Sequence, residues 1–130
     1  MQKSIINPWQ WQDNLGYAQS VEVGHAKHTL YCAGQAAMNA AGQPVAADMG
    51  SQIRLSFDNL ETVLHQADYS LADVVRLNFY TTSVEQFFGA YGEVIGRLSA
   101  VGCVPASTLI EVKALAFPEL LVEIEATAVK

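Results

Sequence analysis

The sequence predicts an α+β fold in which one mixed β-sheet carries two helices packed on one of its faces. Apolar residues repeat with period two in several short runs and with the period of a helix in two longer ones. The resulting order is strand, strand, helix, strand, helix, strand, strand. A helix between two strands implies a crossover connection, and helices on one face leave the other face to be covered by something else.

The length and composition indicate a single domain, 1–130, that is short of charge. A chain of 130 residues can bury roughly two thirds of its extended surface, and 51% of the residues are hydrophobic while only 15% are charged. We therefore expect some apolar surface to be covered by a second copy. Cys32 and Cys103 stand apart from each other and from any His/Cys cluster, so we expect reduced, buried thiols.

The net charge and the apolar runs exclude several classes of function. The formal net charge is −6 and the seven basic residues are scattered, so we expect no nucleic-acid binding. No apolar run approaches the length of a membrane span, and residues 1–13 lack the apolar core of a signal peptide. These features favour a cytoplasmic protein that does not bind membranes.

The first half of the chain predicts two strands and a helix. Residues 17–24 and 28–35 are rich in β-forming side chains and are separated by a short connection, so we expect a hairpin. Residues 39–46 form a loop, and Asp48 is a plausible N-cap for the helix that follows. The apolar stripe of that helix consists of Ile53, Phe57, Leu60 and Leu64.

The second half predicts a strand, a helix and two further strands. Residues 72–82 alternate, and their second face, with Arg76, Asn78 and Tyr80, is polar enough to border a cavity or an interface. Ser83 has capping-box spacing to Gln86. The helical stripe that follows stops at Gly102 and comprises Val84, Phe87, Phe88, Tyr91, Ile95 and Leu98. Residues 107–115 and 120–129 read as strands joined by a turn around Pro118.

Metal and cofactor motifs are missing from the sequence. His25 and His28 lie at a hairpin turn and His65 on the polar side of a helix, without carboxylates at ligand spacing. The run "AAGQP" lacks the lysine and helix start of a phosphate-binding loop, and G-x-S-x-G does not occur. We expect neither a metal nor a cofactor.

Carboxylates on the last strands are the first candidates for chemistry. Glu123 and Glu125 share one strand face, with Glu111 possibly opposite on a hairpin partner, and clustered carboxylates can supply a general acid or hold a water. A solvated or salt-bridged strand face is the alternative. Tyr17 can cap a pocket or simply pack. Ser107 has no histidine near it in sequence, and an unassisted serine is a weak nucleophile, which favours a structural role.

Six blocks of the sequence, from about Gly16 to the end of the chain, follow one another in a familiar order: "GYAQSVEVG", "YCAGQ", "FDNLETVLHQADYSLADVVRLNFYTT", "FFGAYGEVI", "VPASTLIEV" and "LLVEIEATAV". Through these blocks the chain resembles the Rid family, the YjgF-like proteins related to reactive intermediate deaminase A. Only the N-terminal "INPWQWQDN", with Trp9 and Trp11, departs from the usual small-residue lead.

The resemblance implies a homotrimer of chorismate-mutase-like subunits whose sheets face inward as a barrel. It also implies three pockets at the clefts between subunits. In deaminating members an arginine in a "PAR" motif pairs with the substrate carboxylate, and a glutamate-held water hydrolyses the imine or enamine to a keto acid and ammonia. Glu123 matches the glutamate, Tyr17 and Gly34 match other pocket positions, and the backbone N–H of Leu109 is expected to face the cleft.

Two positions depart from the deaminase pattern. "PAS" replaces "PAR", so Ser107 stands at the arginine position, and Phe88 stands where many members carry an asparagine. A hydroxyl supplies no charge, whereas a guanidinium supplies a planar fork that matches a carboxylate. We expect the pocket to persist with a different ligand preference.

Three hypotheses follow from the resemblance and its departures. The first is a trimer that binds a small, uncharged or weakly polar metabolite and hydrolyses it through a water held by Glu123. The second is a true 2-imino-acid deaminase in which Arg76, or a basic group of the adjacent subunit, replaces the missing arginine. The third is a binding or regulatory protein without turnover.

Overall fold

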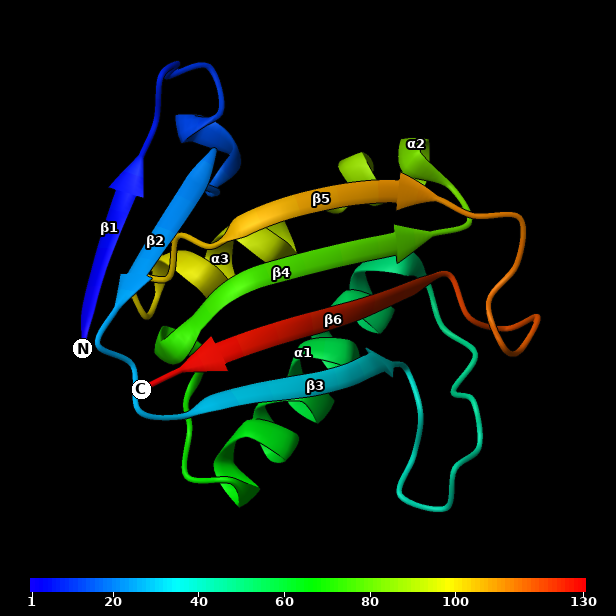
Figure 1. The fold of residues 1–130 in the computed structure, drawn as a ribbon. Coiled ribbons are helices and arrows are strands. Elements are labelled where there is room, and N and C mark those ends of the chain that lie inside the picture. The colour runs from blue at the N-terminus through cyan, green and yellow to red at the C-terminus, as the bar shows by residue number, and fades with distance from the viewer.

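The computed structural model describes residues 1–130 and has two layers, a mixed β-sheet and the helices that cover one of its faces (Figure 1). Four strands form the sheet in the order β3 (Thr29–Ala36), β6 (Val122–Val129), β4 (Val74–Thr81), β5 (Ala106–Glu111). β6 runs antiparallel to both of its neighbours, and β4 and β5 are parallel. The helices are α1 (Met49–Gln66), α2 (Val84–Gly89) and α3 (Gly92–Ser99). This arrangement confirms the predicted α+β class.

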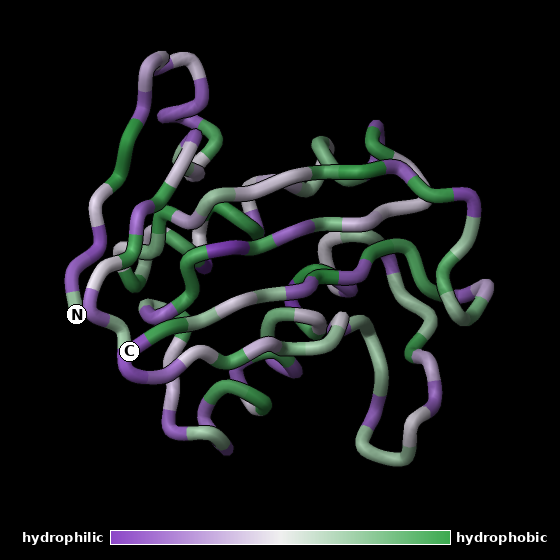
Figure 2. The backbone as a smooth tube through the Cα atoms, in the orientation of Figure 1, coloured by the Kyte–Doolittle hydropathy of each residue, from purple (hydrophilic) through white to green (hydrophobic).

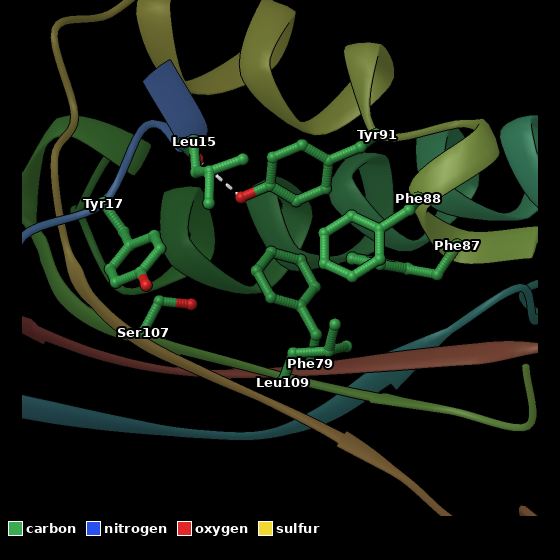
Figure 3. Close-up of a pocket in the computed structure, with 8 residues that line it drawn as sticks. All are labelled: Leu15, Tyr17, Phe79, Phe87, Phe88, Tyr91, Ser107 and Leu109. Carbon is green, nitrogen blue, oxygen red and sulfur yellow. Dashed lines mark hydrogen bonds between the residues drawn. The ribbon is translucent and has the colours of Figure 1, made fainter. Parts of the chain in front are cut away.

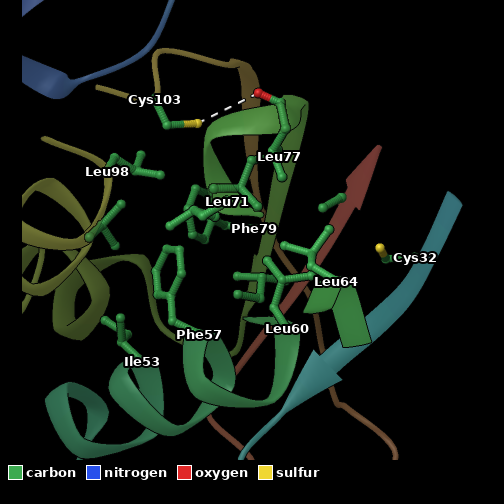
Figure 4. Packing of buried hydrophobic residues seen from close by; sticks show 14 of the residues in the cluster. Cys32, Ile53, Phe57, Leu60, Leu64, Leu71, Leu77, Phe79, Leu98 and Cys103 are labelled. Carbon is green, nitrogen blue, oxygen red and sulfur yellow. Dashed lines mark hydrogen bonds between the residues drawn. The ribbon is translucent and has the colours of Figure 1, made fainter. Parts of the chain in front are cut away.

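The hydrophobic core lies between α1 and the sheet (Figure 4). The predicted stripe of α1 is confirmed, because Ile53, Phe57, Leu60 and Leu64 are all at most 1% exposed. Asp48 caps the helix as predicted, and its Oδ1 accepts a hydrogen bond from Ser51 N at 2.8 Å. Figure 2 shows that hydrophilic and hydrophobic residues alternate along β4. The hydrophobic residues face the helices, and the hydrophilic residues lie on the opposite face of the sheet.

Both cysteines are free and buried, as expected. Cys103 packs into the core near β4, where its Sγ donates to the carbonyl of Val74 at 3.6 Å (Figure 4). Burial raises the pKa of the Cys103 thiol to about 11 and also raises the pKa of Cys32. Neither thiol is therefore poised as a nucleophile near neutral pH.

The predicted hairpin of residues 17–24 and 28–35 is wrong. β2 (Ser20–Gly24) pairs instead with β1 (Gln2–Ile6), a strand that the sequence did not predict, and the two form a separate antiparallel sheet. β3 pairs with β6. His25, between β2 and β3, has a φ of 60°, so the chain leaves the strand direction there and the two segments separate.

The second helix is interrupted and the final hairpin does not form. α2 ends at Gly89 and α3 begins at Gly92, although Ser83 caps α2 as predicted, its Oγ accepting from Gln86 N at 3.1 Å. β5 ends at Glu111 rather than at residue 115, and it pairs with β4, not with β6.

No helix of the structure combines the length and the apolar character that crossing a bilayer requires.

Candidate functional site

A pocket opens between the helix side of the sheet and the helices, with a cavity volume of about 110 Å³. It takes residues from the 3₁₀ turn η1 (Asp13–Leu15), from β4 and β5, and from α2 and its C-terminal end (Figure 3). The lining consists of Leu15, Tyr17, Phe79, Phe87, Phe88, Tyr91, Ser107 and Leu109. Four of the residues predicted for the site therefore meet in one cavity.

Tyr17 and Ser107 are brought together by a short β-bridge between distant parts of the chain. Ala18 bridges Ala106 in parallel, and its N–H donates to the carbonyl of Pro105 at 2.9 Å. Their neighbours Tyr17 and Ser107 consequently lie close to each other at one end of the pocket (Figure 3). Pro105 ends the connection that precedes β5 and fixes where that strand begins. The position of residue 107 at the pocket is therefore set by Pro105 and Ala106 and does not depend on which side chain residue 107 carries.

The opposite end of the pocket is a chain of aromatic rings. The centroids of Phe79 and Phe87 are 5.2 Å apart, and Tyr91 lies 5.6 Å from both Phe87 and Phe88, in tilted or edge-on arrangements. Phe87 is fully buried, whereas Phe88 is 50% exposed and so stands at the mouth. Sequence alone gave Phe79 and Phe87 no site role, because their spacing is that of ordinary core residues.

Tyr91 links the helices to the segment that carries Tyr17. Its hydroxyl donates to the carbonyl of Leu15 at 2.5 Å (Figure 3). Burial raises the pKa of Tyr91 to about 12, and the hydroxyl of Tyr17 adds to the rise. The phenol is therefore neutral at physiological pH, and its proton holds η1 against α3.

The electrostatic character of the pocket is neutral. No arginine, lysine or histidine is among the lining residues, and neither the Ser107 nor the Tyr17 hydroxyl has a hydrogen-bonding partner within the protein. Two hydroxyls can donate to and accept from a ligand, but they cannot neutralise a carboxylate. The cavity thus offers apolar contact with a small polar end.

Glu123 and Gly34 lie elsewhere, on the face of the sheet turned away from the helices. Glu123 alternates with the buried Val122 and Ile124 of β6, which fixes its direction. A Cβ built on Gly34 would come within 2.7 Å of the Glu123 carboxyl group, so glycine at this position leaves the room that the glutamate occupies. The two predicted residues are neighbours, but within one chain the sheet separates them from Ser107.

A hydrogen-bonded cluster occupies the same open face. Tyr80 Oη donates to Glu125 Oε1 at 2.7 Å, and Asn78 Nδ2 donates to the same oxygen at 3.2 Å. The tyrosine hydrogen bond is the main reason that the pKa of Glu125 lies below its ordinary value, and it raises the pKa of Tyr80. Glu125 is thus a stable anion rather than a general acid. The alternation of residues 72–82 had indicated this polar face.

The predicted grouping of Glu111 with Glu123 is wrong. Glu111 lies in register with the buried Thr81, on the helix side, and its Oε1 accepts from Val84 N at 2.9 Å at the start of α2. Arg76, considered above as a substitute anchor, is on the open face, where its charge helps to lower the pKa of Glu125. Within one chain it cannot reach the pocket. No three His, Cys, Asp or Glu residues are grouped so as to hold a metal.

The sheet order, the helices on one face and the "PAS" strand beside an aromatic pocket together define the YjgF-like class of α+β proteins. A family model described as Endoribonuclease L-PSP matches residues 12–130. The chain belongs to this family, which includes the Rid and RutC proteins.

Relatives of known structure support this assignment. A protein of unknown function of the Rid family from Yersinia pestis is 37% identical over the whole of both chains, with a TM-score of 0.87. The YjgF gene product of Escherichia coli is 26% identical and has a TM-score of 0.71, with 88% of this chain and 87% of that chain covered.

Two relatives found by sequence similarity have names that give a family or an activity. A RutC family protein of Pyrococcus horikoshii is 31% identical across 88% of this chain and 86% of its own. A 2-iminobutanoate/2-iminopropanoate deaminase of Escherichia coli is 27% identical across 88% and 87%.

Proposed function

We propose that this chain forms a homotrimer that binds a small, uncharged or weakly polar metabolite in clefts between subunits, and that it is not a standard 2-imino-acid deaminase. The observation that carries the proposal is the neutral lining of the pocket. Ser107 stands in it where deaminating relatives have an arginine, and the remaining lining residues are aromatic or aliphatic. A carboxylate brought into such a cavity would lose its hydration without gaining a counter-charge.

The positions of Glu123 and Gly34 support a site completed between copies. These residues and the pocket lie on opposite faces of one sheet, so a carboxylate could meet the pocket's ligand only from an adjacent subunit. If the ligand carries a C=N bond, water held by that Glu123 would add to its carbon, and ammonia would leave as the carbonyl forms. The net charge of −6 speaks against the ribonuclease activity in the family's description.

An imine-hydrolysis assay tests the proposal. An amino-acid oxidase acting on alanine generates 2-iminopropanoate, and keto-acid release is followed above the spontaneous rate. The unmodified protein is expected to be on the order of a hundredfold less efficient than Ser107→Arg, because the variant regains a charge-assisted bidentate contact. Ser99→Arg is the matched control, since it makes the same exchange at an exposed residue at the end of α3 that does not line the pocket. Efficient hydrolysis by the unmodified protein would refute the arginine argument and leave Arg76 of an adjacent copy as the anchor.

Light scattering tests the assembly separately. The open face presents exposed Tyr31 and Ile110 beside the Tyr80 and Glu125 cluster, a mixture of apolar and paired polar groups typical of an interface. We expect a mass of three chains at micromolar concentration. A monomer at that concentration would remove the basis for a site between subunits.

A further inference from the structure

The loop before β2 places an exposed tryptophan against the pocket. Trp11 is 64% exposed, and its ring meets the ring of Tyr17 edge-on, with centroids 6.4 Å apart. Tyr17 in turn lines the cavity. An indole that packs against a lining residue while most of its own surface stays open is at the rim of the site, where a ligand could cover it.

The loop itself is held firmly, so the exposure of Trp11 does not result from a loose segment. The Oδ1 of Asn7 accepts from Gln19 N at 2.8 Å, which closes the loop at its base. Gln12, the residue after Trp11, is fully buried and accepts from the Gln19 side chain at 2.8 Å. A buried, hydrogen-bonded glutamine beside an exposed tryptophan fixes the backbone at the point from which the indole projects.

The cavity matches a planar ring in lining and in size. Five of its eight lining residues are aromatic, and they are arranged in tilted and edge-on pairs. Such surfaces favour aromatic guests, which can add one more tilted or stacked pair. Its volume of about 110 Å³ is comparable to the roughly 150 Å³ apolar cavity that admits benzene in another protein. The hydroxyls of Tyr17 and Ser107 provide hydrogen bonds for one polar, neutral substituent.

We propose that the ligand of this pocket is a neutral, monocyclic aromatic or heteroaromatic molecule, and that Trp11 is a specificity-determining residue that covers its outer edge. The inference rests on the proposed function, since it names the class of ligand for the same site. This inference gives the N-terminal segment "WQWQDN", which departs from the usual family pattern, a role beside the pocket. Trp9 is the comparison residue, because it is similarly exposed at 58% but its ring forms no aromatic pair with a lining residue.

Binding of three matched probes tests the inference. Benzamide is planar and neutral, cyclohexanecarboxamide has the same amide on a saturated ring, and benzoate has the same ring with a negative charge. Dissociation constants are measured by calorimetry on the full chain, on Trp11→Ala and on Trp9→Ala. Benzamide is expected to bind at least about tenfold more tightly than either other probe.

Trp11→Ala should weaken benzamide by about fivefold or more and leave cyclohexanecarboxamide unchanged, while Trp9→Ala should leave both unchanged. Equal binding of the two amides, or an unchanged benzamide affinity in Trp11→Ala, would overturn this inference and leave the proposed function intact. Benzoate binding as tightly as benzamide would instead refute the neutral pocket of the proposed function. Failure of all three probes to bind at millimolar concentration would overturn this inference, and the imine-hydrolysis assay would still decide the proposed function.

Discussion

The helix side and the open side of the four-stranded sheet differ in what covers them. On the helix side Leu77, Phe79 and Ile124 are nearly inaccessible, and the aromatic pocket forms where this packing ends at the edge strand β5. On the open side Tyr31 is 80% exposed, Tyr80 and Asn78 donate hydrogen bonds to Glu125, and the Oδ1 of Asn78 is buried without a partner. A single chain therefore builds the aromatic pocket on one side and leaves the other side of the sheet uncovered. The difference teaches that the two halves of the proposed site have different origins: one chain supplies the pocket, and in the proposed trimer an adjacent copy supplies Glu123.

The largest difference between the two sides is expected in stability. Phe57→Ala removes a fully buried ring from the core and should lower the free energy of unfolding by about 3–5 kcal/mol. Tyr31→Ala, on the open side, should lower it by less than about 0.5 kcal/mol within one chain. Urea unfolding at several protein concentrations separates the two cases, because any larger loss in Tyr31→Ala should depend on concentration. A large, concentration-independent loss in Tyr31→Ala would show that the open side is part of the chain's own core.

On the helix side, alkaline pH tests the buried phenol of Tyr91. Burial raises the pKa of Tyr91 from its ordinary value of 10.0 to about 12, so the folded state holds the phenol's proton more tightly than the unfolded state. The stability this provides is complete below pH 10 and is lost as the pH rises to about 12. Tyr91→Phe should flatten this part of the stability profile, measured by urea midpoints. An unchanged slope in Tyr91→Phe would contradict the buried, neutral phenol.

On the open side, Glu125 is expected to give a pH effect opposite in direction to that of Tyr91. The hydrogen bond from Tyr80 lowers the pKa of Glu125 below its ordinary value of 4.5. The stability from this contact is present above that value and is lost as the pH falls through the lowered pKa. Tyr80→Phe should therefore be less stable than the unmodified protein at neutral pH, and the difference should vanish in strong acid. Carboxyl NMR titration of Glu125 would give the direct reading, and a pKa unmoved by Tyr80→Phe would refute the account.

A modest effect on stability is expected at Gly34. An added methyl group would press on the flexible end of Glu123, which can swing aside, so Gly34→Ala should cost less than about 1 kcal/mol. It should nevertheless move the Glu123 carboxylate, visible as a change in its carbon chemical shift. Gly24→Ala is the control, because a Cβ there meets nothing within 4 Å. An unmoved carboxylate in Gly34→Ala would show that the glycine does not position this glutamate.

The sequence predicted those features that local periodicity determines. The stripe of α1, the caps at Asp48 and Ser83, and the alternation of β4 each follow from side chains a few residues apart. Strand pairing was predicted poorly, because it depends on contacts between distant segments. "QKSII" carries too little pattern to indicate β1, and without β1 the only visible partner for β2 was β3.

The site was predicted through the family resemblance more than through the residues themselves. The motif positions led to Tyr17, Phe88, Ser107 and Leu109, which the fold collects in one cavity. The pattern of residues 107–129 predicts a hairpin, and a hairpin would place Glu111 opposite Glu123. With β5 parallel to β4, Glu111 points to the helices and Glu123 away from them. The bridge from Ala18 to Ala106, which joins segments almost 90 residues apart, has no local signal.

The most direct test of the central claim, that Ser107 makes this pocket select neutral ligands, is the ratio of dissociation constants for benzoate and benzamide. The unmodified protein should bind benzamide at least about tenfold more tightly. Ser107→Arg should reverse that preference, because the guanidinium pairs with the carboxylate, and Ser99→Arg, at an exposed residue outside the pocket lining, should not. Tight benzoate binding by the unmodified protein, or an equal reversal in Ser99→Arg, would contradict the claim.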